Sequence, residues 1–167
     1  MAAQHIARSD CERIRPGLLA QPVNTVSSLA YCAVGAWIWH RSQPEPTAGW
    51  RVVAAASVVV GLGSAAYHGP GGRGSRILHD TSNVALALAV AANLVGADRP
   101  PRPGLLKVAA VASISGLTLH HTSRTDRILC RPDALLQGHA AWHLLGAVAV
   151  LTTAEAHHPP AQTSTES

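Results

Sequence analysis

Apolar positions along the chain gather into long stretches, and charged side chains are confined to the gaps between them. The third stretch is the only one with a charge inside it, Asp80. Since a helix crosses the hydrocarbon core of a bilayer with roughly 20 apolar residues, and about 17 at least, the pattern predicts five transmembrane helices. The five stretches cover residues 18–40, 52–72, 77–97, 108–123 and 134–154.

The predicted fold is therefore an all-α integral membrane protein. A soluble bundle of Ala-rich helices is the alternative, but such helices carry a charged outer face at helical spacing, which is missing here. We expect a single transmembrane helical domain over residues 1–156 and a disordered tail over residues 157–167. The predicted helices cover about residues 18–40, 52–68, 77–97, 105–121 and 133–154.

Composition narrows the class of protein further. Only 13% of the residues are charged, about half of the roughly 25% that is typical of soluble domains. The 13 Lys and Arg against 9 Asp and Glu give a net charge of +4, which is too small and too dispersed for a nucleic-acid groove. Three cysteines are too few for a disulfide-dense scaffold.

Polar side chains within the stretches gather at one end of each. In an antiparallel bundle, the starts of the first, third and fifth helices and the ends of the second and fourth meet on one membrane face, which we name side A. Ionisable groups in membrane helices are costly and mark function, so we expect a functional site at side A. The polar residues there are Gln21, Asn24, Thr25, Ser27, Ser28, Ser64, His68, His79, Asp80, Ser82, Asn83, His120, His121, Gln137, His139 and His143.

Two of these clusters have the spacing of metal ligands. His139 and His143 are four residues apart and project from one helical face, and His68 can supply a third nitrogen to a tetrahedral zinc ion. Three protein ligands leave a position for water, whose pKa falls to about 7 in such sites. Asp80 could then accept the proton of that water and pass it to a leaving group. Ser64, one turn before His68, could hydrogen-bond a developing oxyanion.

Each of these residues also has a structural explanation. Two histidines four apart are by themselves more often a surface accident, and His68 could be an interfacial histidine at a helix end. Asp80 could cap the third helix, and Ser64 could serve close helix packing. Their joint occurrence at side A favours the metal site. Alternative ligands are His79, His120 and His121.

Five motifs follow one another along the chain: Asp10-Cys11-Glu12, residues 21–29 (QPVNTVSSL), residues 61–68 (GLGSAAYH), Asp80, and residues 137–143 (QGHAAWH). In this order they resemble the alkaline ceramidases and the wider membrane-hydrolase superfamily that includes the progestin and adipoQ receptors and the Per1-like proteins. The resemblance covers about residues 10–153. It implies that His68, His139 and His143 bind zinc, that Ser64 stabilises the oxyanion, and that Asp80 is the general acid and base while water attacks an amide.

The chain departs from the ceramidases in two respects. It has room for about five spans, so it resembles a short member with a reduced version of a seven-span fold. The ceramidases also bind calcium through an acidic N-terminal cluster and a glutamate in the first span. Here Asp10 and Glu12 remain, Gln21 takes the place of the glutamate, and Asn24 completes a possible secondary polar site. Because hard cations need several charged oxygens, we do not expect calcium.

The resemblance also implies a disulfide and an orientation. In the ceramidases a cysteine before the first span is bonded to one before the last, which corresponds here to Cys11 and Cys130. A disulfide would place side A in an oxidising compartment. Counting Lys and Arg gives eight at side A and five at the opposite end, side B, a weak bias the other way. We expect side A to face away from the cytoplasm.

Together these patterns predict a zinc-dependent intramembrane hydrolase that cleaves an amide bond of a lipid or N-acyl lipid. The alternative from another class is a zinc-containing membrane receptor or sensor, like the receptor branch of the superfamily, without significant turnover. A third reading, a structural membrane protein with packing histidines, accounts less well for polar residues that gather at one end.

Overall fold

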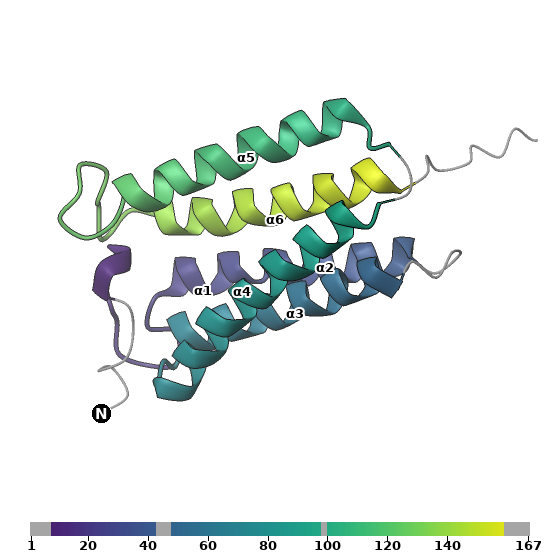
Figure 1. Ribbon diagram of the computed structural model, residues 1–167. Helices are drawn as coiled ribbons and strands as arrows, with labels where there is room; N and C mark the ends of the chain where they lie inside the picture. The colour runs from purple at the N-terminus through teal and green to yellow at the C-terminus, as the bar shows by residue number, and fades with distance from the viewer. Residues whose placement is uncertain (1–7, 43–47, 98–99, 159–167) are drawn as a thin grey trace, which may run out of the picture.

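Helices make up the regular structure of the protein. The computed structural model describes residues 8–42, 48–97 and 100–158, and no strand occurs in these ranges. The helices lie side by side in an elongated bundle (Figure 1), which confirms the all-helical prediction. In chain order they are the 3₁₀ helix η2 (Arg8–Asp10), α1 (Pro22–Ser28), α2 (Ala30–Arg41), α3 (Ala48–His68), α4 (Arg73–Val95), α5 (Pro103–Thr122) and α6 (Gly138–His157).

Local sequence signals set the helix ends. Pro22 and Pro103 lie at the starts of α1 and α5, where a missing backbone N–H breaks no helical hydrogen bond. Because of Pro22, the first helix begins at residue 22 instead of the predicted 18. The last helix, α6, begins at 138 instead of 133. At its other end α6 continues through His157, the first residue of the predicted tail. The last nine residues of that tail, 159–167, lie outside the described residues.

The predicted first helix is divided into α1 and α2 at Leu29. The hydroxyls of Ser27 and Ser28 donate to the carbonyl oxygen of Asn24, at 3.1 and 2.7 Å, and such bonds compete with the backbone ladder and bend helices. Beyond the break the ladder resumes, since Ala33 N donates to the Leu29 carbonyl. The break directly follows the last of the polar residues of α1, Ser28.

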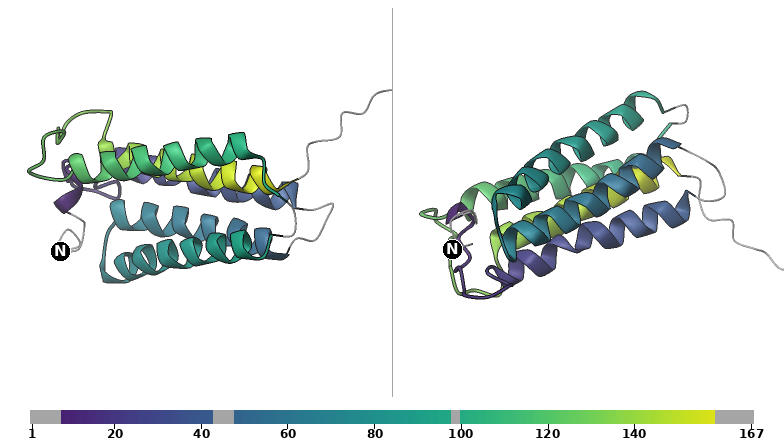
Figure 2. Two further views of the ribbon diagram at one scale, coloured as in Figure 1. Left: turned by 45° about the horizontal axis from the view of Figure 1, so that its top comes forward. Right: turned by 90° about the horizontal axis from the view of Figure 1, so that it is seen from below.

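Three of the helices, α3, α4 and α5, are long and apolar enough to cross a membrane. Their outer faces carry large apolar side chains, of which Leu88 and Ile114 are each 66% exposed. Exposed apolar surface on this scale suits contact with lipid. The α1–α2 pair and α6 lie alongside these three helices (Figure 2).

Packing joins the helices in pairs. α5 packs against α6, and α3 packs against both α2 and α4. The contact between α2 and α3 is close because Gly35 and Gly61 have no side chain; a Cβ at Gly61 would meet Cys32 and the Ser28 carbonyl. Small residues at such crossings are typical of membrane helix pairs.

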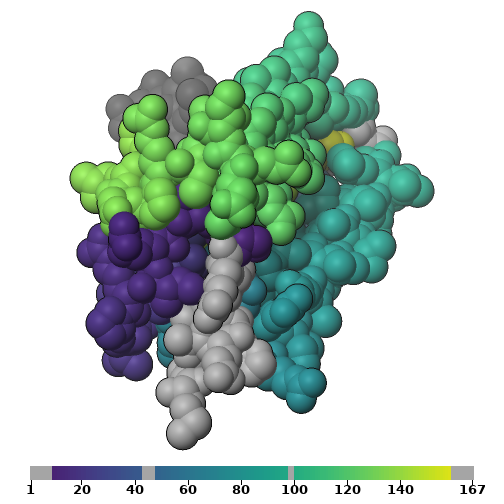
Figure 3. Space-filling view, turned by 90° about the vertical axis from the view of Figure 1, so that its left-hand side faces the viewer, coloured from purple at the N-terminus to yellow at the C-terminus, as the bar shows by residue number. Residues whose placement is uncertain are grey.

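One end of the bundle brings together the helix ends that the alternating topology assigned to side A. The starts of α1, α4 and α6 and the ends of α3 and α5 lie at the left of Figure 1. The N-terminal segment and the α5–α6 connection adjoin across this end (Figure 3). Their backbones are joined by hydrogen bonds from Arg13 N to Pro132 O, 3.0 Å, and from Thr125 N to Ser9 O, 2.9 Å. This layer covers the polar residues beneath it.

Candidate metal centre

Three histidines from two helices converge at side A. His68 is the last residue of α3, while His139 and His143 lie one turn apart in the first two turns of α6. Their ring centroids are 4.6 to 5.3 Å apart, and each offers a ligand nitrogen within 4.8 Å of the other two. The structure thus brings together the three ligands predicted from the sequence.

The histidine rings are buried, and each has one nitrogen without a partner. His68, His139 and His143 are 0%, 6% and 2% exposed. The Nε2 atom of each has no hydrogen-bond partner among the described residues. Because a buried polar atom without a partner costs free energy, three of them in one place fit the donor set of a bound metal ion.

Hydrogen bonds at the opposite ring nitrogen fix the orientation of His68. Its Nδ1 lies 2.7 Å from Gln21 Oε1, and the Gln21 amide nitrogen donates to the Glu12 carbonyl at 3.1 Å. Since the Gln21 oxygen can only accept, His68 Nδ1 carries the proton and Nε2 keeps its lone pair. Partners of this kind orient metal-binding histidines and set their tautomer.

His143 is held in the same way by α1. Its Nδ1 lies 2.9 Å from Ser27 Oγ and 3.4 Å from Ser28 Oγ. Both hydroxyls donate to the Asn24 carbonyl, so their oxygens are free to accept the Nδ1 proton of His143. The polar start of the first helix, which the sequence indicated only as a cluster, supplies the partners of two candidate ligands.

His139 has a different environment. Its Nδ1 lies 3.2 Å from His120 Nδ1 at the end of α5 and 3.6 Å from Asp10 Oδ1. Asp10 Oδ2 is also 4.0 Å from His68 Nδ1. His120, expected as an alternative ligand, is therefore a neighbour of the candidate ligand His139. Asp10 and Gln21, which the sequence placed in a secondary polar site, adjoin the histidines directly.

Asp10 is buried in the layer that covers side A. Burial raises the pKa of its carboxyl from 3.8 to about 6, against the lowering effect of a hydrogen bond from Ser9. The next residue, Cys11, forms a disulfide with Cys130, the pairing that the family resemblance implied. The disulfide anchors Asp10 to the α5–α6 connection.

Glu12, the other acidic residue of the N-terminal cluster, caps α1. Its two carboxylate oxygens accept the backbone N–H groups of Val23 and Asn24, each at 2.8 Å. A carboxylate in this place satisfies unpaired N–H groups and the positive end of the helix dipole. Glu12 thus holds the helix that carries the partners of His68 and His143.

The two predicted catalytic residues differ in their placement. Ser64 is buried one turn before His68 on α3. The structure does not bring Asp80 to the three histidines: its side chain is 59% exposed, with Oδ1 2.9 Å from His79 Nδ1 and Oδ2 3.7 Å from Arg76 Nε. The buried face of α4 includes Ser82 and Leu86. At about 100° per residue, Asp80 lies roughly 200° around the helix from Ser82 and therefore on the opposite face.

His79 lies between Asp80 and the histidine cluster. Its ring centroid is 4.9 Å from that of Tyr67 and 6.0 Å from that of His68. It is therefore a neighbour of the site, as His120 is, and the pair His79–Asp80 reaches from the outer face of α4 toward His68. The remaining alternative ligand, His121, contacts His120 by its ring.

The donor set suits a metal ion. Three imidazoles, each with one nitrogen occupied by a partner and the other unpaired, can hold a divalent ion and leave it an open position. The third cysteine, Cys32, lies in α2 with its Sγ 3.7 Å from the Val58 carbonyl, away from the histidines. No family model, curated protein or solved structure matches the chain.

Proposed function

We propose that the protein is a zinc-dependent intramembrane hydrolase that cleaves an amide bond of a lipid-like substrate, as the resemblance to the alkaline ceramidases implies. The observation that carries the proposal is the convergence of three unpaired imidazole nitrogens in a buried site beside candidate membrane helices. All-nitrogen ligation by three histidines favours zinc over calcium or magnesium, which prefer oxygen. The α1–α2 pair and α6 would complete a bundle of five spans.

The ligands and the buried serine have separate tasks in this proposal. Zinc held by three protein ligands lowers the pKa of a water molecule to about 7 and polarises a carbonyl oxygen. His68, His139 and His143 would hold the ion, with Gln21 and Ser27 fixing two of the rings. Ser64 lies one turn from His68, and we assign its hydroxyl as a donor to the carbonyl oxygen of the substrate.

Proton transfer is assigned to His79 and Asp80. The Asp80 carboxylate accepts the hydrogen bond of His79 Nδ1 at 2.9 Å, which would orient the His79 ring. His79 would then carry the proton between the site and the outer face of α4, and Asp80 would act through it. Asp10 is the competing carboxylate, since it is the one described acidic residue within 4.0 Å of a ligand histidine nitrogen.

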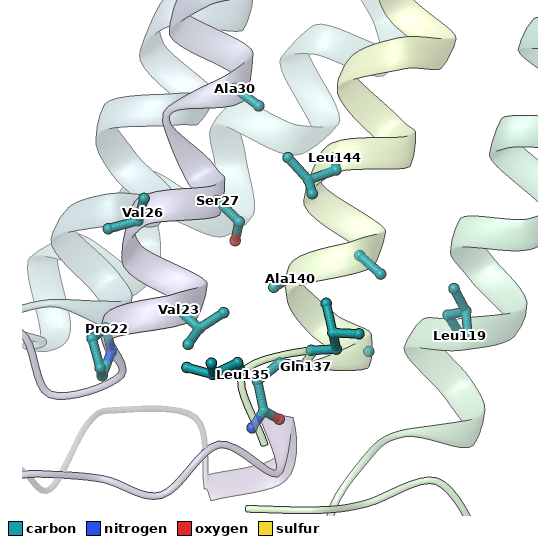
Figure 4. Close-up of a pocket in the computed structure, with 13 residues that line it drawn as sticks. Pro22, Val23, Val26, Ser27, Ala30, Leu119, Leu135, Gln137, Ala140 and Leu144 are labelled. Carbon is teal, nitrogen blue, oxygen red and sulfur yellow. The ribbon is translucent and has the colours of Figure 1, made fainter. Parts of the chain in front are cut away.

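An apolar groove between α1 and α6 supports a substrate with an acyl chain (Figure 4). Its volume is about 780 Å³, and its walls include Val23 and Val26 of α1, Leu144 of α6 and Leu135 of the preceding connection. Ser27 also lines the groove, and its hydroxyl contacts His143. An acyl chain in the groove would therefore lie beside the helix that orients a metal ligand.

The test is metal analysis and hydrolysis assays on the protein purified in detergent. We expect about one zinc ion per chain, removal of zinc and activity by a chelator, and recovery of both when zinc is added back. Hydrolysis is measured by mass spectrometry on a panel of N-acyl lipids that varies head group and chain length. Wild-type protein without zinc, or activity that survives chelation, would refute the proposal.

Variants separate the assigned roles. His139→Ala should lose zinc and activity together, whereas Ser64→Ala should keep zinc and lose about 10²- to 10³-fold in kcat. Asp80→Asn and His79→Gln should keep zinc and lose activity to a similar extent. If Asp10→Asn loses activity with zinc retained while Asp80→Asn does not, the proton acceptor is Asp10.

The receptor is the second candidate, and the exposed position of Asp80 favours it. A ligand-binding protein needs the metal to order the bundle but needs no acid or base at the site. Zinc bound at one ion per chain with no turnover of any N-acyl lipid would support the receptor over the hydrolase.

A further inference from the structure

Asn24 is a buried polar residue whose side chain no interaction described so far uses. It lies in α1 and is 0% exposed. Its backbone groups are occupied: N–H donates to Glu12, and the carbonyl accepts from Ser27 and Ser28. Its side-chain Oδ1 and Nδ2 are both buried without a hydrogen-bond partner among the described residues.

An unpaired carboxamide in this position is costly to the fold. Burial of a donor or acceptor without a partner forfeits its hydration, whereas an apolar side chain of the same shape would not. The other buried polar side chains of α1 avoid this cost, because Thr25 Oγ1 donates to the Gln21 carbonyl and the serines donate to that of Asn24. Asn24 therefore differs from its neighbours in α1, because its side-chain atoms are buried without a hydrogen-bond partner. It shares this property with the Nε2 atoms of the three histidines.

Helical spacing places Asn24 on the face of α1 that serves the metal ligands. Gln21, Asn24 and Ser28 follow one another at intervals of three and four residues and share one face. At one end of this row Gln21 contacts His68 Nδ1, and at the other Ser28 contacts His143 Nδ1. Asn24 lies between these two contacts, on the face turned toward the ligands.

We propose that the Asn24 carboxamide binds the polar group of the ligand that occupies the open position at the three histidines. This assignment rests on the proposed hydrolase. A carboxamide carries an acceptor oxygen and an NH₂ group with two donors, so Asn24 would donate to the carbonyl oxygen of a substrate amide or accept from its N–H. An ester has no N–H to donate, so Asn24 would also contribute to a preference for amides over esters.

The test measures ligand binding to the cobalt-substituted protein, with acetohydroxamic acid as the probe and the visible cobalt spectrum as the readout. Asn24→Leu should bind cobalt within about threefold of wild type and bind acetohydroxamate about tenfold more weakly, the effect of one hydrogen bond. Asn24→Asp, which keeps the shape and loses the donor, should also weaken the probe. Thr25→Val is the matched control and should bind the probe like wild type.

The melting temperature of the metal-free protein distinguishes a ligand-binding role of Asn24 from a structural role, because the two roles predict different effects of Asn24→Leu. Replacement of an unpaired buried amide by Leu should leave the melting temperature unchanged or raise it, whereas a structural Asn24 would make it fall. Equal acetohydroxamate binding by wild type and Asn24→Leu, or loss of cobalt from Asn24→Leu, would overturn the assignment alone. Wild-type protein that binds neither cobalt nor zinc would overturn the proposed function as well.

Discussion

Buried histidines lie at both ends of the helical bundle, but those at side A differ from the one at side B in how their ring nitrogens are used. At side B, His158 Nδ1 lies 2.8 Å from the Ala154 carbonyl and Nε2 lies 3.3 Å from Ser42 Oγ. At side A, each of the three clustered histidines has a partner at Nδ1 and none among the described residues at Nε2. Burial alone therefore does not mark a histidine as a candidate metal ligand; the unpaired ring nitrogen does.

The carboxylates at the two ends also differ in how their oxygens are compensated. Glu155 at side B accepts hydrogen bonds from Trp37 Nε1 at 2.9 Å and Arg41 Nε at 3.3 Å, so cationic and neutral donors compensate its burial. Asp10 at side A faces two histidines and has a raised pKa. Glu155 and His158 at side B thus have partners for their polar side-chain atoms, as in a structural network, whereas the Nε2 atoms of the three histidines at side A have none among the described residues.

The sharpest test of this difference is metal-dependent stability. Zinc at a thousand times its Kd should stabilise the wild-type protein by about 4 kcal/mol, because the ion binds the folded state. His143→Ala should abolish this stabilisation, whereas His158→Ala should keep it although it also removes a buried ring. Thermal unfolding with and without zinc measures both; equal responses of the two variants would erase the distinction between the ends.

Replacing a hydrogen-bond partner of a ring nitrogen should have a smaller effect on zinc binding, and again only at side A. Gln21→Leu removes the acceptor of His68 Nδ1 and should weaken zinc binding about 10- to 100-fold. Ser42→Ala removes the partner of His158 Nε2 and should leave the zinc affinity unchanged. Competition with a chromophoric chelator gives both dissociation constants, and a similar loss in the two variants would mean that both act through global stability.

Neutralising one hydrogen-bonded carboxylate at each end should have comparable effects on stability. Glu12→Gln weakens the cap of α1, and Glu155→Gln weakens the contacts with Trp37 and Arg41; we expect each to cost about 1 kcal/mol. Only Glu12→Gln should also lower the zinc affinity, since α1 carries the partners of His68 and His143. Loss of zinc affinity in Glu155→Gln would indicate that side B supports the site.

The smallest effect is expected at the surface pair Arg13–Asp133 at side A. The hydrogen bond from Arg13 lowers the pKa of Asp133, so any contribution is present at neutral pH and disappears as pH falls through that lowered pKa. Because both side chains are 61% exposed, solvent screens the pair. Asp133→Asn should leave the melting temperature unchanged at pH 7; a measurable drop would show that the N-terminal segment depends on this contact.

Parts of the site were predictable because helical periodicity is a local property. The spacing of His139 and His143 places them on one face wherever their helix packs, and alternation of apolar stretches put His68 at the same end. The role of the first helix was visible only as a cluster of polar residues, since spacing within one helix does not say which ring each side chain meets. Glu155 and His158, three residues apart, form side-B contacts that no motif indicated.

The placement of Asp80 could not be predicted from helical periodicity. It falls inside an apolar stretch at side A, which made it the obvious carboxylate, yet the rotation of α4 turns it outward to Arg76 and His79. Asp10 lies outside every apolar stretch and reaches the histidines because the disulfide and backbone hydrogen bonds fold the N-terminal segment over the bundle. Helix rotation and the path of a non-helical segment depend on contacts between distant parts of the chain.

The sequence by itself determined the helices, their alternation and the end at which polar residues collect, because these depend on periodicity, chain length and the exclusion of charge from apolar stretches. Only the tertiary structure decided which nitrogens stay unpaired, which carboxylate lies near them, and which helix holds the rings. Those properties depend on distances of a few ångströms between residues that lie far apart in the chain, such as Asp10 and His139. Such distances are set by packing.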